Sequence, residues 1–136
     1  MGFKNKKVLV PEGASKKDTY SHGIAVPIGD KEMIFVTGQI AMDKNGIAIA
    51  PNDIEKQTVF VFESIETILK EAGSSLDDVV KVVIYVTNIN DFSKISPIRN
   101  KYLARSKPVS TLVEINSTVK DGCDIEIDVI AMKKHK

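Results

Sequence analysis

The segment from Val79 to Thr87 constrains the fold of this chain most, because it is apolar on both faces of an extended strand. Successive side chains of a strand point to opposite faces. Val80, Val82, Ile84 and Val86 would form one wholly apolar face, and the other face, Val79, Lys81, Val83 and Tyr85, would break its apolar run only at Lys81. A strand of this kind is typical of the interior of a sheet that is covered on both sides.

One clear helix precedes this strand. Asn52 is the expected N-cap, with Asp53 and Glu55 in the first turn, where the helix dipole favours acidic side chains. Gly73 is expected to end the helix. Between these ends the apolar residues recur at spacings of three and four, which is the helical period: Ile54, Val61, Phe62, Ile65, Ile68, Leu69 and Ala72.

Shorter segments complete the predicted order. Strands are expected at 7–10, at 24–28 and 33–37 as a hairpin that Gly38 ends, and at 47–49, 109–115 and 124–132. A weaker helix is expected at 91–103, with Asp91 as its cap and Pro97 inside it. This order predicts one α+β domain over residues 1–136, with a mixed sheet and two helices packed on one face. Because the second face also carries apolar positions, we expect self-association.

Composition narrows the function classes. The formal net charge is +1, so no overall field attracts nucleic acid or an anionic membrane. The single cysteine, Cys123, excludes an intramolecular disulfide, and with only two histidines neither a thiolate-rich nor a two-histidine metal site is expected. Nucleotide-binding and metalloprotease motifs are missing. No apolar run approaches the ~20 residues of a membrane span, and we expect a cytoplasmic protein without a cofactor.

Short motifs in order along nearly the whole chain carry a family resemblance. They are Tyr20-Ser21, Val36-Thr37-Gly38-Gln39-Ile40, Gln57-Thr58, Ile68-Leu69, Ala72 to Lys81, Asn90-Asp91-Phe92, Pro108, Val113-Glu114, Ile125-Glu126-Ile127 and Ile130-Ala131. Together they resemble the Rid family, also called RidA or YjgF, with the older names L-PSP endoribonuclease and translation inhibitor. The resemblance implies a chorismate-mutase-like fold and a homotrimer with a cleft at each subunit interface. It also implies cofactor-independent hydrolysis of 2-iminobutanoate and 2-iminopropanoate to 2-oxo acids and ammonia.

The resemblance also assigns residues to the pocket. Tyr20 matches the family's pocket tyrosine, and Thr37-Gly38-Gln39 matches its pocket turn. Glu126 matches the glutamate that holds the attacking water, and it is the expected catalytic residue. Imine hydrolysis needs such a placed water, a proton for the nitrogen, and a cation for the substrate carboxylate.

Other pocket positions depart from the family pattern. Ser110 stands where the family has an arginine, whose planar fork binds a carboxylate through two hydrogen bonds. Leu112 replaces a cysteine, Ser96 replaces an asparagine, and Arg99 replaces a tyrosine. Losing a desolvated carboxylate partner costs ~2–5 kcal/mol. The chain is therefore interpreted as a divergent member that lacks the catalytic arginine, and ordinary imine deaminase activity is in question.

Four functions stay open. The first is a trimer whose clefts bind small metabolites resembling 2-imino or 2-oxo acids. The second is a working imine deaminase in which Arg105 or Lys107, from the shortened loop before Pro108, supplies the cation. The third is a ribonuclease or translation inhibitor, which lysines 4, 6, 7, 16 and 17 favour and the near-neutral charge opposes. The fourth is a metabolic regulator that binds other proteins. The expected partners are further copies of the chain and a small molecule, without membrane or nucleic acid.

Overall fold

The computed structural model describes residues 5–11 and 19–134 of the 136-residue chain. Lys4, Lys16 and Lys17, which the ribonuclease alternative counts, lie outside the described residues. The strands are β1 Lys7–Leu9, β2 Gly23–Ile28, β3 Lys31–Ile40, β4 Val79–Val86, β5 Val109–Glu114 and β6 Ile125–Lys134. The helices are α1 Ile54–Lys70 and α2 Phe92–Tyr102, with short 3-10 turns η1 Leu76–Asp78 and η2 Ile89–Asp91.

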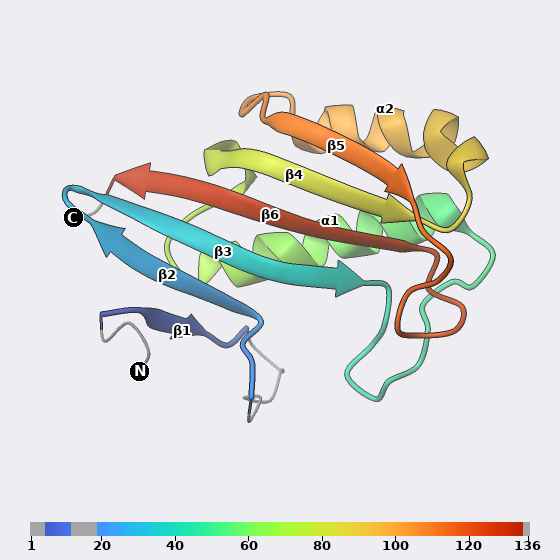
Figure 1. Cartoon of the computed structure of the whole chain (residues 1–136), viewed down its shortest axis with the longest axis horizontal. Helices are drawn as coiled ribbons and strands as arrows, with labels where there is room; N and C mark the ends of the chain where they lie inside the picture. Colours follow the sequence, from blue (N-terminus) through green and yellow to red (C-terminus); the bar gives the residue numbers. More distant parts are fainter. Residues whose placement is uncertain (1–4, 12–18, 135–136) are drawn as a thin grey trace.

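All these strands form one sheet in the order β1-β2-β3-β6-β4-β5 (Figure 1). β4 and β5 run parallel, and every other neighbouring pair is antiparallel, so the expected mixed sheet is confirmed. The parallel pair needs a crossover connection, which α2 supplies. β6 pairs with β3 on one side and with β4 on the other, so it lies in the middle of the sheet.

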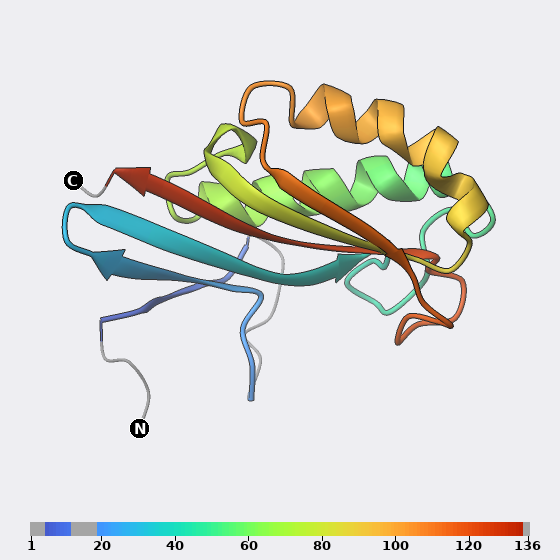
Figure 2. The ribbon, with the colours of Figure 1, turned by 45° about the horizontal axis from the view of Figure 1, so that its top comes forward.

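Both helices cover the same face of the sheet, as the sequence predicts (Figure 2). The apolar stripe of α1 is buried there against the inward side chains of β3, β4 and β6. α2 packs on α1, and the Phe62 ring stacks on the Tyr102 ring with 4.9 Å between centroids. This layer holds the hydrophobic core. Pro97 lies inside α2, which continues past it to Tyr102.

The start of α1 corrects the predicted cap. Asp53, not Asn52, is the N-cap, and its side chain accepts a hydrogen bond from the Lys56 backbone N–H at 3.1 Å. Asn52 has a φ of 69°, in the left-handed region that asparagine tolerates better than most residues. The prediction is wrong by one residue, because Asn and Asp are about equally good caps. α1 ends at Lys70, and Gly73 then adopts a φ of 71° in the turn that closes it.

Three other local predictions are also corrected. Gly38 does not end the strand, because β3 continues to Ile40 through a bulge between Val36 and Gln39. The strand predicted at 47–49 is only an isolated bridge, Met42 to Ala48. Asp91 stands at the N-cap position of α2 but makes no capping hydrogen bond with its side chain.

No described segment of the chain covers the second face of the sheet, which is largely apolar. Paired residues form a row across it: Val8, Ile24, Phe35 and Ile130. Val8 and Phe35 are each 36% exposed. One polar pair lies beside this row, where the Tyr85 hydroxyl donates a hydrogen bond to Asp128 Oδ2 at 3.1 Å. The described residues thus cover β4 on one side only, although its sequence favours cover on both.

None of the described helices is both long and apolar enough to cross a lipid bilayer.

Candidate functional site

A groove of about 760 Å³ opens where β3 ends, between α1 and the loop that follows β3. Tyr20, Thr37, Gly38 and Gln39 line it, so the structure brings together these four predicted pocket residues. The β3 bulge turns Gln39 toward α1, where the Ser64 hydroxyl donates to its Oε1 at 2.9 Å. The Gln39 amide group donates to the Thr37 carbonyl at 3.0 Å. These bonds fix the Gln39 side chain at the groove wall.

Gln57 holds the loops around this groove, a role that its match to a family motif does not reveal. It is fully buried on α1. Its amide group donates to the carbonyls of Gly122 at 2.7 Å and Ile49 at 3.1 Å, and its Oε1 accepts from the Asp124 N–H at 3.0 Å. One side chain therefore joins the loop after β3 to the loop before β6. A fully buried amide that satisfies backbone groups in two loops is a positioning residue.

Glu126 reaches the β3 bulge from the uncovered face of the sheet. A Cβ atom added at Gly38 would collide with the Glu126 carboxylate, which therefore lies directly against the backbone of the pocket turn. Glu126 pairs with Ile40 on one side and Tyr85 on the other. The predicted catalytic carboxylate is thus adjacent to the turn, on the other side of β3 from Gln39.

The surroundings of Glu126 favour its protonated form. Burial raises the pKa of its carboxyl group, and the neighbouring Asp128 charge raises it further. Burial also raises the pKa of the nearby Tyr85 hydroxyl, with the hydrogen bond to Asp128 as the next cause. A carboxyl group that keeps its proton to higher pH is better suited than an ordinary carboxyl group to exchange a proton with a bound ligand.

A second, smaller hollow of about 360 Å³ lies between the C-terminal part of α2 and the start of β5. Ser110 lines it, together with Arg99, Asn100 and Lys107. Ser110, the position predicted to match the family arginine, therefore borders a hollow that the basic residues Arg99 and Lys107 also line.

Three predicted binding residues are absent from the lining of both hollows. Ser96 accepts a hydrogen bond from Arg99 Nη2 at 3.1 Å. Leu112 is partly buried and packs against the hydrophobic core. Arg105 forms an ion pair with Asp77 at 3.6 Å, and its side chain is 84% exposed.

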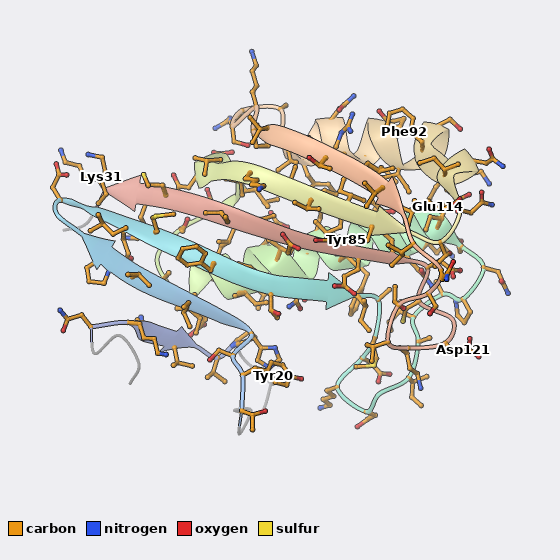
Figure 3. The ribbon with its side chains drawn as sticks, viewed as in Figure 1. Tyr20, Lys31, Tyr85, Phe92, Glu114 and Asp121 are labelled. Carbon is orange, nitrogen blue, oxygen red and sulfur yellow. The ribbon has the colours of Figure 1, made fainter. Side chains whose placement is uncertain are left out.

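The two hollows lie at different parts of the sheet. Strand order places β3 and β5 three strand spacings apart, which is about 14 Å. In Figure 3, Tyr20 lies beside the strands β1 and β2, whereas β5 forms the opposite edge of the sheet. One chain therefore does not place Ser110 opposite Tyr20 and Gln39.

In the part of the chain that the structure describes, the remaining candidate groups lie apart from one another. Cys123 is buried, its thiol donates to the Ala41 carbonyl at 3.2 Å, and burial raises the pKa of that thiol. Among residues 5–11 and 19–134, no three His, Cys, Asp or Glu side chains are grouped as metal ligands would be.

These features define a class of small α+β protein with one mixed sheet, helices on a single face and hollows at two places along the sheet. The Endoribonuclease L-PSP family profile matches residues 13–133. The chain therefore belongs to that family, which is the Rid family named in the sequence analysis.

Individual relatives agree with this assignment. A RutC family protein of Pyrococcus abyssi is 42% identical over 130 residues, which cover 95% of this chain and 98% of the relative. The solved structure of the Rid family protein YyfA from Yersinia pestis is 33% identical, covers 93% of this chain and 98% of its own, and has a TM-score of 0.80. A 2-iminobutanoate/2-iminopropanoate deaminase of Bos taurus is 29% identical over 100 residues, which cover 74% of this chain and 72% of the relative.

Proposed function

We propose that this protein is a homotrimer that binds small metabolites resembling 2-imino or 2-oxo acids in clefts between its subunits. The observation that carries the proposal is the division of the pocket residues into two hollows that one chain holds apart. A neighbouring copy of the chain could bring its β5 edge beside the end of β3 in the first copy. The hollow at Ser110 of one subunit and the groove at Gln39 of the other would then form one cleft.

The uncovered sheet face supports the same assembly. A row of apolar side chains runs across it from β1 to β6. Contiguous exposed apolar surface of this kind marks an interaction site. Packing three such faces against one another would bury that row and cover the second side of β4.

Imine hydrolysis is the second candidate function, and Glu126 favours it. In this reaction water adds its oxygen to the imine carbon and a proton to the nitrogen. The C–N bond then breaks, the nitrogen leaves as ammonia, and the oxygen remains as the 2-oxo group. Glu126 would hold the water and carry the proton, a role that suits its raised pKa. The bovine relative is named for this activity.

One experiment on the purified protein tests the first proposal. Light scattering should give three times the 14.9 kDa chain mass. Calorimetric titration should show binding of 2-oxobutanoate, the stable analogue in which oxygen replaces the imine nitrogen. Gln39→Ala should weaken that binding about tenfold, since a lost polar ligand contact is worth roughly 1.4 kcal/mol. Asp30→Asn, in the β2–β3 turn at the other end of β3, should change nothing. A trimer that does not bind 2-oxobutanoate would contradict the proposal.

The hydrolysis candidate has its own assay. 2-Iminobutanoate is generated by an amino-acid oxidase, and semicarbazide traps the imine that survives. Slower semicarbazone formation in the presence of the protein would support hydrolysis, and Glu126→Gln should abolish the effect. A rate equal to the uncatalysed one would leave ligand binding as the function.

A further inference from the structure

The charged side chains that line the hollow beside Ser110 are all positive. Of the residues that line it, Arg99 and Lys107 are basic, and Asn100 and Ser110 are neutral hydrogen-bonding residues. The others are Leu103, Ala104 and Pro108, so no acidic side chain takes part in the lining. A small concave site with two cations and no counter-charge favours an anion.

Arg99 is held in a fixed orientation at this hollow. Its Nε donates to Asn100 Oδ1 at 3.2 Å, and its Nη2 donates to Ser96 Oγ at 3.1 Å and to Asn100 Oδ1 at 3.1 Å. The guanidinium also lies over the Phe92 ring, 5.6 Å from the ring centroid. Among the described residues nothing accepts a hydrogen bond from Nη1, so the guanidinium keeps donors for a ligand. Because its orientation is already set, little side-chain entropy is lost on binding.

Lys107 stands on a constrained backbone at the rim. Its φ is 48°, in the left-handed region that is unfavourable for a residue with a Cβ. Its N–H donates to the Leu103 carbonyl at 3.0 Å, and Pro108 follows directly. No described residue pairs with the Lys107 ammonium group. Strained backbone of this kind often occurs at functional sites.

A simpler explanation for basic residues here is the helix dipole, which favours cations in the last turn of α2. Lys101 shares that turn and fits this explanation, because it does not line the hollow. Arg99 differs, because its guanidinium has two polar partners and it borders the hollow. Arg105 also differs from Arg99, because it pairs with Asp77 outside the hollow. The dipole alone therefore does not account for Arg99 and Lys107.

We propose that Arg99 and Lys107 together bind the carboxylate of a small 2-oxo or 2-imino acid, in place of an arginine at position 110. The Arg99 Nη1 donors and the Lys107 ammonium hold the two carboxylate oxygens, and Ser110 leaves room for them. Ser96 and Asn100 are positioning residues that orient Arg99. This inference rests on the proposed binding of small acids in the clefts, and it assigns the group that anchors them.

Calorimetric titration of the trimer with 2-oxobutanoate tests the inference. Arg99→Gln and Lys107→Gln should each weaken binding by about tenfold or more, as expected for the loss of a charged hydrogen-bonding partner. Arg105→Gln is the matched control and should bind like the wild type. Arg99→Lys keeps the charge but loses the fork, and its affinity should lie between those of Arg99→Gln and the wild type. Ser110→Arg should increase the affinity for 2-oxobutanoate only slightly, because Arg99 and Lys107 already bind the carboxylate.

The outcomes separate this inference from the proposed function. If the wild type binds 2-oxobutanoate and the Arg99 and Lys107 variants bind it equally well, the inference is wrong and the proposed function stands. If the folded wild-type trimer binds no 2-oxobutanoate, the proposed function itself fails. Inorganic phosphate is the comparison anion: binding of phosphate without binding of 2-oxobutanoate would overturn the carboxylate assignment. Light scattering on each variant shows whether the trimer is intact.

Discussion

At position 38 the pocket turn has room for a hydrogen atom and no side chain. A Cβ atom there would meet the Glu126 side chain, with its Cδ at 2.8 Å. We expect Gly38→Ala to lower the free energy of unfolding by about 1–3 kcal/mol, the usual cost of overpacking. Chemical denaturation measures the change.

A second variant shows whether Glu126 is the cause. In the background of Glu126→Ala the alanine at position 38 has space, so the double variant should recover most of the loss. Residues in contact show such non-additive effects. A loss of equal size with and without Glu126 would mean that the backbone conformation alone requires glycine.

Glu126 also gives a pH-dependent prediction. Its pKa in the folded chain lies above the ordinary value of 4.5, because of burial and Asp128. The folded state then binds more protons than the unfolded state between these two pKa values, so stability falls as the pH rises through that range. Glu126→Gln should therefore unfold at a higher temperature than the wild type at about pH 8, and lose this advantage at about pH 4. An equal gain in unfolding temperature at both pH values would contradict the raised pKa of Glu126.

The sequence could assign most pocket residues only through resemblance. Tyr20 and Thr37 to Gln39 do lie in one groove, and Ser110 does border a hollow. The orientation of Arg99 could not be predicted, because it depends on hydrogen bonds to two residues on the same helix. From the sequence alone, Arg105 is as suitable as Arg99 to supply the cation for a substrate carboxylate. The structure pairs Arg105 with Asp77 instead, and this ion pair depends on how η1 and the α2–β5 loop meet in space.

At the scale of single elements, variants at the start of α1 test whether Asp53 is the N-cap. Asp53→Ala removes the acceptor for the Lys56 N–H and should cost about 0.5–2 kcal/mol of stability. Asn52→Gly should be neutral or stabilising, because glycine adopts a φ near 69° without strain. Thermal unfolding compares the two variants. A larger loss for Asn52→Gly than for Asp53→Ala would restore Asn52 as the cap.

The strands and helices were predictable where side chains repeat with a clear period. The helical repeat located α1, and the alternation in 124–132 located β6. The strand end predicted at Gly38 is wrong, because glycine is usually unfavourable inside a strand. Here Gly38 lies in a bulge, where the absence of a side chain leaves space for the Glu126 carboxylate. The requirement for glycine at position 38 comes from Glu126, which is 88 positions away in the chain. The sequence pattern around Gly38 therefore cannot reveal it.

At the scale of the whole molecule, the uncovered sheet face predicts how assembly can be broken. Phe35 lies in the apolar row across that face and pairs with Ile130. Phe35→Asp would place an unpaired charge in the proposed interface, a cost of several kcal/mol. We expect the variant to have the 14.9 kDa mass of one chain by light scattering.

The control for this prediction is another exposed apolar residue away from the sheet face. Ile47 lies in the loop after β3 and is 60% exposed. Ile47→Asp should keep the mass of the trimer. Circular dichroism on both variants checks that the chain is folded. A Phe35→Asp protein that is folded and still trimeric would show that this face is not the interface.

The central place of β6 has a consequence for how the chain folds. β6 follows every other described element, yet it joins the two halves of the sheet. Its pairing of Ile34 with Ala131 joins residues 97 positions apart in the chain, and such distant contacts form slowly. During synthesis from the N-terminus, α1 and the strands on both sides are made before the strand that unites them. Their apolar faces stay open to unwanted partners until β6 emerges, so the complete core of this domain forms only after β6 has been made.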